Sequence, residues 1–391
     1  MLESIYVGMT GLLGYSKGLR VIANNTANIN TPGFKGSSLQ FSDLFYSNSG
    51  QGGGAGQVGY GLNANGTTLS FRQGELRQTG NDLDMAVDGT GLFILENEKG
   101  DVTYTRAGQF QFNTEGMLIN KIDHSFVMGR DASGNLVRIS LAGLQTNAGS
   151  ATTTVKFSGN LSSTMAEQTV GGVKVVDALG GEHMLSVKLT DTSATTAGSW
   201  QVDLMDGTNV VGTGEIIFQD GRPQSTAAKV QVIYTPAGLS AVPLTLDFST
   251  EVTSYPSANL STLAMASQNG FGPGGLTKAT FDAAGALSLT YSNGQVIKST
   301  RLALARFDSL EAVESVGDNQ FGSKDVRAWH IGAAGMGGFG NVRSGMVEIS
   351  NVDLSQEFSD LVVMQRGYQA SSQVISTAND MLQELFAMKS K

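Results

Sequence analysis

The chain of 391 residues contains no cysteine, and its charged residues make up only 15% of the total. The lack of cysteine excludes disulfides, a thiolate nucleophile and any cysteine-ligated metal. The charged share lies well below the quarter that is usual in globular domains. A chain without thiols also suits an extracellular protein that travels unfolded, because it cannot become cross-linked on the way.

Positive charge is also scarce, and the net charge is −9 without any block of Lys or Arg. A nucleic-acid binder needs a basic stripe to neutralise phosphates, and attraction to anionic lipid has the same requirement. No run approaches the ~18 consecutive apolar residues of a membrane span. The first residues, Met1 to Ile5, lack the basic start of a secretory signal. We therefore expect no nucleic acid and no membrane insertion, and either a cytoplasmic location or export by a route without a cleaved signal peptide.

Glycine, in contrast, is abundant at 51 residues, whereas proline is limited to 6. Glycine supplies the positive φ that tight turns require, so this composition favours a β-rich protein with many turns. Hydrophobic residues make up 40%, and the length allows two or three domains with their own cores.

The middle of the chain shows the period of two that is typical of strands. The apolar positions that carry this pattern are Leu83, Met85 and Val87; the run Leu92 to Leu95; Phe110 and Phe112; Trp200, Val202 and Leu204; Val230, Val232 and Tyr234; and Leu244, Leu246 and Phe248. Asp220-Gly221 and Asn293-Gly294 are turn signals, the second between strands over 287–291 and 302–304.

The two ends differ from this middle, because their apolar residues recur at alternating steps of three and four. Such seams predict helices that pair with helices. The N-terminal seam holds Leu2, Ile5, Met9, Leu12, Ser16, Leu19, Ala23 and Thr26, with Ile22 alongside; the C-terminal seam holds Leu361, Met364, Tyr368, Ser371, Ile375, Ala378, Leu382 and Leu385. Asp353 or Ser355 is placed to cap the second helix.

The N-terminal helix contains Gly8, Gly11, Gly14 and Gly18. Each costs about 1 kcal/mol relative to Ala in a helix interior, and an isolated helix is marginal even without them. The same glycines allow close backbone approach once neighbours are present. We therefore predict that this segment orders only on assembly.

Two terminal helices around a β-rich middle predict a nested α+β fold that is predominantly β. The helices would pair in a coiled-coil-like inner domain, with two or more β-rich domains outside it. This is the organisation of a fibre subunit with a helical inner layer.

The segments that join the helices to the middle carry a family likeness. Residues 23–35 resemble the signature shared by flagellar rod and hook proteins, and residues 71–74, 79–84, 87–93 and 104–110 resemble its next blocks. Residues 344–354 and 364–369 resemble the C-terminal motif. The residues that carry the two signatures are Asn24, Asn25, Asn28, Thr31, Gly33, Phe34, Lys35, Ser350, Asn351, Val352, Asp353, Leu354, Gln365, Arg366, Tyr368 and Gln369.

The long middle favours the hook branch of this family, because rod proteins are shorter and lack a large insertion. Segments 175–180, with His183, and 267–273 resemble hook-protein segments. Two departures concern helix contacts: Thr26 stands where the signature has an aliphatic residue, and Ser371-Ser372 replaces the usual Asn.

The resemblance implies a radial layout and a structural function. Residues 1–28 and 355–391 would form the inner helical domain, 29–71 a linker with a Gly-rich segment, 72–146 and 274–350 a middle β domain, and 147–273 an outer β domain. The chain would polymerise into a curved hollow tube, a universal joint that transmits motor torque and lines the export channel. Implied partners are copies of the chain, the distal rod protein, the hook cap, hook–filament junction proteins and the type III export apparatus. The implied location is outside the cell, in the flagellar hook attached to the basal body.

Patterns that could indicate an enzyme or a metal site are weak, so we expect no catalytic residue, cofactor or metal. Gly14 to Gly18 fits G-x-S-x-G but lies within a helical pattern, not between a strand and a helix. Two G-x-G-x-x-G matches, at 54–59 and 335–340, open no helix. Asp82, Asp84 and Asp88 lack the spacing of a calcium loop, and the three histidines at 124, 183 and 330 are isolated.

Three alternatives remain open at this point. The first is a distal rod subunit, which would form straight polymers. The second is a secreted β-rich adhesin, which would be a stable monomer with dispensable ends. The third is a hydrolase that uses Ser16.

Overall fold

The computed structural model describes residues 2–48 and 57–389, with side chains for residues 3–45 and 59–388. The Gly-rich tip at 49–56 lies outside the described residues, and so does the side chain of Leu2. The described fold is mostly β with one helix at each end, which confirms the predicted fold class. By its internal contacts the chain divides into a helix-bearing unit (residues 1–142, 279–288 and 298–391) and a β-sandwich unit (residues 143–278 and 289–297).

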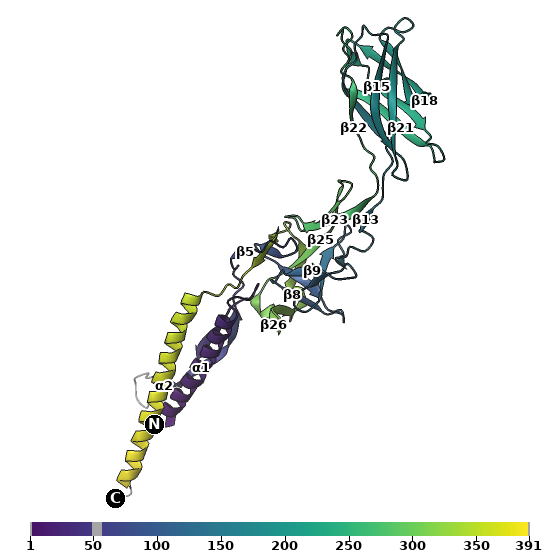
Figure 1. Cartoon of the computed structure of the whole chain (residues 1–391). Coiled ribbons are helices and arrows are strands. Elements are labelled where there is room, and N and C mark those ends of the chain that lie inside the picture. The colour runs from purple at the N-terminus through teal and green to yellow at the C-terminus, as the bar shows by residue number, and fades with distance from the viewer. Residues whose placement is uncertain (1, 49–56, 390–391) are drawn as a thin grey trace. The chain divides into compact units, whose positions relative to one another are not determined.

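The helix-bearing unit contains both helices, α1 (Leu2–Ala27) and α2 (Leu354–Lys389), which run side by side (Figure 1). At 1.5 Å per residue, their 26 and 36 residues span about 39 and 54 Å. Asp353 caps α2, since its Oδ1 accepts hydrogen bonds from the backbone N–H groups of Ser355 (2.9 Å) and Gln356 (3.3 Å). Of the two predicted caps, Asp353 is correct.

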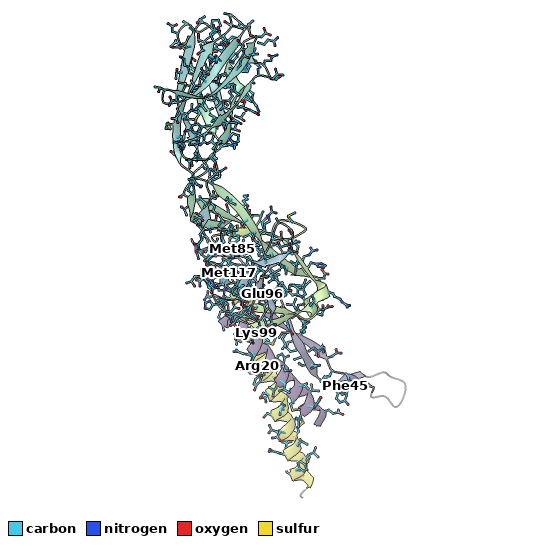
Figure 2. All side chains as sticks on the ribbon, turned by 90° about the vertical axis from the view of Figure 1, so that its right-hand side faces the viewer. Arg20, Phe45, Met85, Glu96, Lys99 and Met117 are labelled. Carbon is cyan, nitrogen blue, oxygen red and sulfur yellow. The ribbon has the colours of Figure 1, made fainter. Side chains whose placement is uncertain are left out.

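A β-hairpin follows α1 and packs against it. It consists of β1 (Ser37–Asp43) with β4 (Leu62–Leu69), extended by β2 (Tyr46–Asn48) with β3 (Gln57–Gly59). Phe45, labelled in Figure 2, stacks on Tyr60 with 4.7 Å between ring centroids. The segment expected only as a linker is thus largely a hairpin.

The β core of this unit is an antiparallel sheet in the order β25-β11-β7-β8-β27-β26, with smaller pairs at its margins. Its strands are β5 (Leu76–Gln78), β6 (Met85–Asp88), β7 (Leu92–Glu96), β8 (Val102–Thr105), β9 (Phe110–Phe112), β10 (Leu118–Asn120), β11 (Phe126–Arg130), β12 (Leu136–Arg138), β25 (Val296–Phe307), β26 (Val313–Gly317), β27 (Gln320–Ser323), β28 (Trp329–Ala333), β29 (Asn341–Ser344) and β30 (Met346–Glu348), with short 3-10 turns η1 (Leu310–Ala312) and η2 (Val326–Ala328).

The buried run Leu92 to Leu95 is confirmed as β7. The alternation predicted for Leu83, Met85 and Val87 is wrong, because β6 begins at Met85 and Ala86 between the two is buried as well. Both faces of this strand are covered, so a period of two cannot develop.

The β-sandwich unit contains β13 (Thr146–Asn147), β14 (Thr154–Asn160), β15 (Glu167–Val176), β16 (Glu182–Asp191), β17 (Ser199–Asp206), β18 (Asn209–Gln219), β19 (Arg222–Pro223), β20 (Lys229–Tyr234), β21 (Val242–Thr253) and β22 (Ala264–Gln268). Three strands, β23 (Gly274–Phe281), β24 (Ala286–Tyr291) and β25, have residues in both units. Sheets β20-β21-β14-β22 and β15-β16-β17-β18-β19 enclose one core (Figure 1).

The sequence pattern of this sandwich is confirmed. Trp200, Val202 and Leu204 are buried on β17, and the alternate positions predicted on β20 and β21 are buried as well. Asp220 and Gly221 form the β18–β19 turn with φ values of 52° and 75°, as expected for a tight hairpin.

The finer division predicted from the sequence, into an inner helical, a linker, a middle and an outer part, stays a prediction.

Candidate self-assembly interface

Three glycines of α1 face α2 at close range, in an antiparallel arrangement. A Cβ atom added at Gly11 would lie 2.5 Å from Ser371 Oγ, and one added at Gly8 would lie 2.7 Å from Ile375 Cγ1. One added at Gly18 would lie 2.9 Å from the sulfur of Met364. Side chains at these positions would push the helices apart, so the glycines set the distance between the two helices.

The N-terminal seam is therefore wrong as the face that meets α2. Successive helical residues are about 100° apart, which places Ile5, Met9, Leu12 and Leu19 roughly 70–150° round the axis from the glycine face. Met9 is 46% exposed, and the other three are half-buried. Ile22, which is buried, lies on the glycine side. Sequence reasoning missed this because it ranked positions by apolar side chains, and glycine has none.

The C-terminal seam does lie on the face that meets α1. Met364 and Ile375 contact the glycine face, Ala378 is buried, and Leu361 and Leu382 are half-buried. At two positions the prediction is less accurate. Tyr368 was expected to meet α1, but Gly367 lies against the ring of Tyr15 instead, and Tyr368 is 42% exposed. Leu385, the last residue of the seam, is 49% exposed.

The pairing leaves two apolar stripes uncovered among the described residues. The α1 stripe consists of the exposed Tyr6, Met9 and Leu13 with the half-buried Ile5 and Leu12 at its edge, and the α2 stripe consists of Val363, Val374, Met381, Leu385 and Met388. In the antiparallel register most of both stripes lies toward the end where the chain termini lie (Figure 1). Contiguous apolar surface of this kind marks a protein contact site in soluble proteins.

A third face of α2 is mostly polar over residues 365–383, where Asp380 is its charged member. It holds Gln365, Gln369, Ser372, Gln373, Ser376 and Gln383, all exposed, whereas the exposed Phe358 and Val362 lie on the same side nearer the start of the helix. These residues recur with the helical period on the side away from α1. The helix thus has one face for α1, one apolar edge and one wetted face.

Residues of the two family signatures meet at the base of the helix pair. Asn25 Nδ2 donates to Glu357 Oε1 (2.9 Å) and to the carbonyl of Ser37 (2.8 Å). Asn351 Oδ1 accepts the backbone N–H of Gly36 (2.8 Å). Two segments more than three hundred residues apart in sequence are therefore bonded side by side.

The other signature residues shape the turns around this base. Asn28 Nδ2 donates to the carbonyl of Asn24 (2.9 Å), and Thr31 Oγ1 donates to Asn28 Oδ1 (3.1 Å), at the end of α1. Ser350 Oγ accepts the N–H of Val352 (3.3 Å) before α2. Phe34 is half-buried, whereas Leu354 and Arg366 are exposed.

Below this base lies a buried ion triad, formed by Lys35, Arg106 and Glu348. Glu348 Oε1 is 2.5 Å from Lys35 Nζ, and its Oε2 is 2.5 Å from Arg106 Nε. Arg106 and Glu348 were not among the predicted site residues, although both lie inside quoted motif segments. A charged residue between apolar neighbours, as Glu348 is in Met-Val-Glu-Ile, was the available signal.

Three segments of the chain match known protein families. Residues 5–35 match a family described as flagella basal body rod protein, residues 86–162 the FlgE/F/G D1 domain of flagellar hook proteins, and residues 343–388 the C-terminal part of flagellar basal body rod FlgEFG proteins. The flagellar hook protein FlgE of Escherichia coli K12 is 30% identical over 408 residues, which cover 97% of this chain and 98% of that protein. The chain belongs to the flagellar hook protein family.

Other relatives extend this likeness. FlgE of Borreliella burgdorferi is 29% identical, with all of both chains covered. The crystal structure of Helicobacter pylori hook protein FlgE2 matches with a TM-score of 0.52 at 15% identity, over 70% of this chain and all of that one, which supports the fold. These relatives are named hook proteins, which favours the hook over the distal rod.

The patterns that suggested other chemistry lie in unrelated places. Ser16 lies in the middle of α1, so its G-x-S-x-G pattern has no strand before it. His183 bonds Asp177 (2.7 Å) and His330 bonds Asp308 (2.8 Å), as isolated pairs. Across residues 2–48 and 57–389, no group of three or more His, Asp or Glu is arranged to hold a metal ion. In the same residues, no helix has the length and apolarity to cross a membrane.

Proposed function

We propose that this chain is a structural subunit of the flagellar hook and assembles with copies of itself through its terminal helices. The observation that carries the proposal is the pair of apolar stripes left uncovered by the α1–α2 contact, in a chain whose relatives are named hook proteins. The polymer would be a curved hollow tube, a universal joint that passes motor torque to the filament.

The stripes support assembly because they face in different directions. The α1 stripe lies away from the face that meets α2, and the α2 stripe occupies one edge of its helix. A contact that uses different patches on the two partners produces a ring where its rotation closes and an open helical polymer where it does not. The prediction that α1 gains its order on assembly follows from the same argument, because neighbours would supply the apolar contacts that its glycines do not.

The polar face of α2 supports a role as the wall of the export channel. Over residues 365–383 its glutamine and serine side chains present hydrogen-bonding groups and little charge, so this part of the face offers a passing unfolded chain little apolar surface to bind. We propose that residues 1–28 and 355–391 form the inner tube and that this face lines its lumen. The β domains, 72–146 with 274–350 and then 147–273, would lie outside it.

The remaining assignments follow from the family. The subunit would act without enzymatic activity, outside the cell, in the flagellar hook attached to the basal body, after export without a cleaved signal peptide. Its partners would be copies of itself, the distal rod protein, the hook cap, the hook–filament junction proteins and the export apparatus.

Substitution within the stripes tests the proposal. Leu13→Asp and Val374→Asp place a charge on each stripe without disturbing the glycine face. Purified full-length protein should form curved tubes under salting-out conditions, visible by negative-stain electron microscopy. Each substitution should raise the concentration of protein left unassembled by at least about tenfold, since burying an unpaired charge costs more than about 1.4 kcal/mol.

Val326→Asp is the matched control, because Val326 is 77% exposed and lies in η2, away from both helices. This variant should assemble like the unmodified protein. Straight polymers would favour the distal-rod alternative. A chain that stays monomeric in every condition, or that assembles equally well with both stripe substitutions, would contradict the proposal.

A further inference from the structure

The buried ion triad holds three charged side chains that are at most 5% exposed. Besides the two ion pairs, Glu348 Oε1 accepts the backbone N–H of Gly74 (2.8 Å). Burying such a group costs free energy, and removing one of its partners strongly destabilises the fold. The three side chains therefore keep one well-defined arrangement.

The cations of the triad are fixed to the β core by backbone carbonyls. Lys35 Nζ donates to the carbonyl of Arg72 (2.8 Å), and Arg106 donates to the carbonyls of Val87 (2.8 Å) and Gly89 (2.6 Å). Burial lowers the pKa of Lys35, and the adjacent Glu348 carboxylate partly opposes this shift. Hydrogen bonds of fixed direction therefore place Glu348 relative to the strands more sharply than apolar contacts would.

The triad lies where the chain leaves α1 and where it approaches α2. Lys35 follows the end of α1, and Glu348 precedes the start of α2. The backbone N–H of Gly33 donates to the carbonyl of Glu348 (2.7 Å). The Gly36–Asn351 and Asn25–Glu357 hydrogen bonds continue this polar contact to the last turn of α1 and the first turn of α2.

The glycine face alone does not define how far α1 is displaced along α2. The glycines that face α2 are Gly8, Gly11 and Gly18. A shift of α1 by one turn brings Gly11 to the former position of Gly8, so the close approach survives the shift at that point. A single polar contact can fix the register of such a repetitive helix pair.

We infer that the Lys35–Glu348–Arg106 triad sets the register of α1 against α2. The three residues act as positioning residues: they hold the end of α1 and the start of α2 at one place on the β core, and the Asn25–Glu357 bond transfers that position to the helices. The inference concerns a single copy of the chain and does not rest on the proposed polymerisation.

The absence of cysteine makes the register measurable. A Cβ atom at Gly11 would lie 3.2 Å from Ser371 Cβ, a few tenths of an ångström below the roughly 3.5–4.5 Å of a disulfide, so a small outward shift of the helices suffices to form the bond. The pair Gly11→Cys with Ser371→Cys therefore reports the observed register. The pair Gly11→Cys with Ile375→Cys reports α1 displaced by one turn. Each pair is oxidised in the full-length monomer, where the disulfide also captures pairing that is only partly populated.

Each reporter pair is then combined with a substitution in the triad. With the triad intact, the observed-register disulfide should dominate. Glu348→Gln and Lys35→Met should each raise the share of the displaced disulfide at least about fivefold. Lys35→Arg keeps the charge and should restore the original ratio, and Asp88→Asn, in the exposed pair Asp88–Arg343, should leave it unchanged.

Three outcomes would overturn the inference. The first is an unchanged disulfide ratio in Glu348→Gln. The second is the formation of neither disulfide when the triad is intact, which would show that the triad does not hold the pair in register. The third is a loss of hydrogen-exchange protection in β7 and β11 as soon as Glu348 is replaced, because the triad would then serve the core and not the register. Polymerisation of the unmodified chain is measured in a separate experiment. Failure of the proposed function can therefore be distinguished from failure of the register inference.

Discussion

The helix pair and the β-sandwich unit satisfy their apolar surface in different ways. The sandwich encloses one continuous core, with members such as Phe157, Trp200, Leu246 and Phe248 less than 4% exposed. In the helix pair, only Ile22 and Ala378 are buried apolar residues among those whose side chains are described. The comparison teaches that the sandwich buries its apolar surface within a single copy, whereas the described helix pair leaves much of its apolar surface exposed.

Glycine contributes to both regions, with different consequences. In the sandwich, a Cβ atom at Gly212 would lie 2.8 Å from Val232 Cβ, so glycine lets β18 approach β20. There the approach closes the core. In α1 the same device brings α2 close but leaves the larger side chains on the opposite face.

The largest expected effect is in the sandwich core. Phe248 is fully buried and stacks on Phe157 with 4.6 Å between ring centroids. Phe248→Ala should destabilise the sandwich by about 3–5 kcal/mol, because it removes buried contacts and leaves a cavity. Hydrogen exchange of β16 and β17 amides measures this loss. Ile233→Ala, at a position 67% exposed on β20, should change it by less than about 0.5 kcal/mol.

A similar loss of hydrogen-exchange protection in the core of the helix-bearing unit would contradict the separation between the two units. If Phe248→Ala also removed protection from β7 and β11, the two units would not be independently stable.

A smaller effect should follow from the titration of Tyr234 in the same sandwich. Burial, and then the nearby Asp206 carboxylate, raise the pKa of Tyr234 to about 12. A raised pKa means that the folded state holds the phenol proton more tightly, so the stabilisation is full below pH 10 and is lost as the pH rises toward 12. The sandwich should lose about 2–3 kcal/mol over that range.

Tyr234→Phe supplies the comparison for this measurement, because it removes the ionisable group and keeps the ring. The unfolding free energy of the unmodified protein, measured relative to that of Tyr234→Phe, should fall by about 2–3 kcal/mol between pH 9 and pH 12. Parallel pH profiles would rule out Tyr234 as the responsible group.

The smallest effect concerns the glycine face. Gly11→Leu should separate the helices at a cost of about 1–3 kcal/mol, partly offset by about 1 kcal/mol of better helix propensity. The net result is weaker pairing in a more helical α1. Circular dichroism reports the helix content, and the concentration of unassembled protein reports the pairing. Ser16→Leu, on the exposed side of α1, gains the propensity without the clash and should assemble at least as well as the unmodified chain.

Much of the sandwich could be read from the sequence because each strand carries its own period. Alternation in β17, β20 and β21 and the Asp220-Gly221 turn are local signals, and the structure follows them. The C-terminal seam was readable for the same reason, since apolar side chains of α2 do meet α1.

The interface was less predictable, because its deciding contacts join distant segments. The glycines of α1 were expected to allow close backbone approach, but the sequence did not indicate that they, and not the apolar seam, face α2. The triad of Lys35, Arg106 and Glu348 unites residues up to 313 positions apart. No periodicity links such residues, and their partnership depends on a fold that the local pattern does not specify.

The hairpin β1–β4 limits how many neighbours α1 can accept. A Cβ atom at Gly14 would collide with Leu62 and lie 3.3 Å from Phe41, so the hairpin covers a second side of the helix beside the one that α2 covers. Thr10 Oγ1 accepts the N–H of Leu62 (3.4 Å) and fixes this contact. Among the described residues, the sector of α1 that holds the α1 stripe stays open. A neighbour that binds α1 would therefore have to approach from that side.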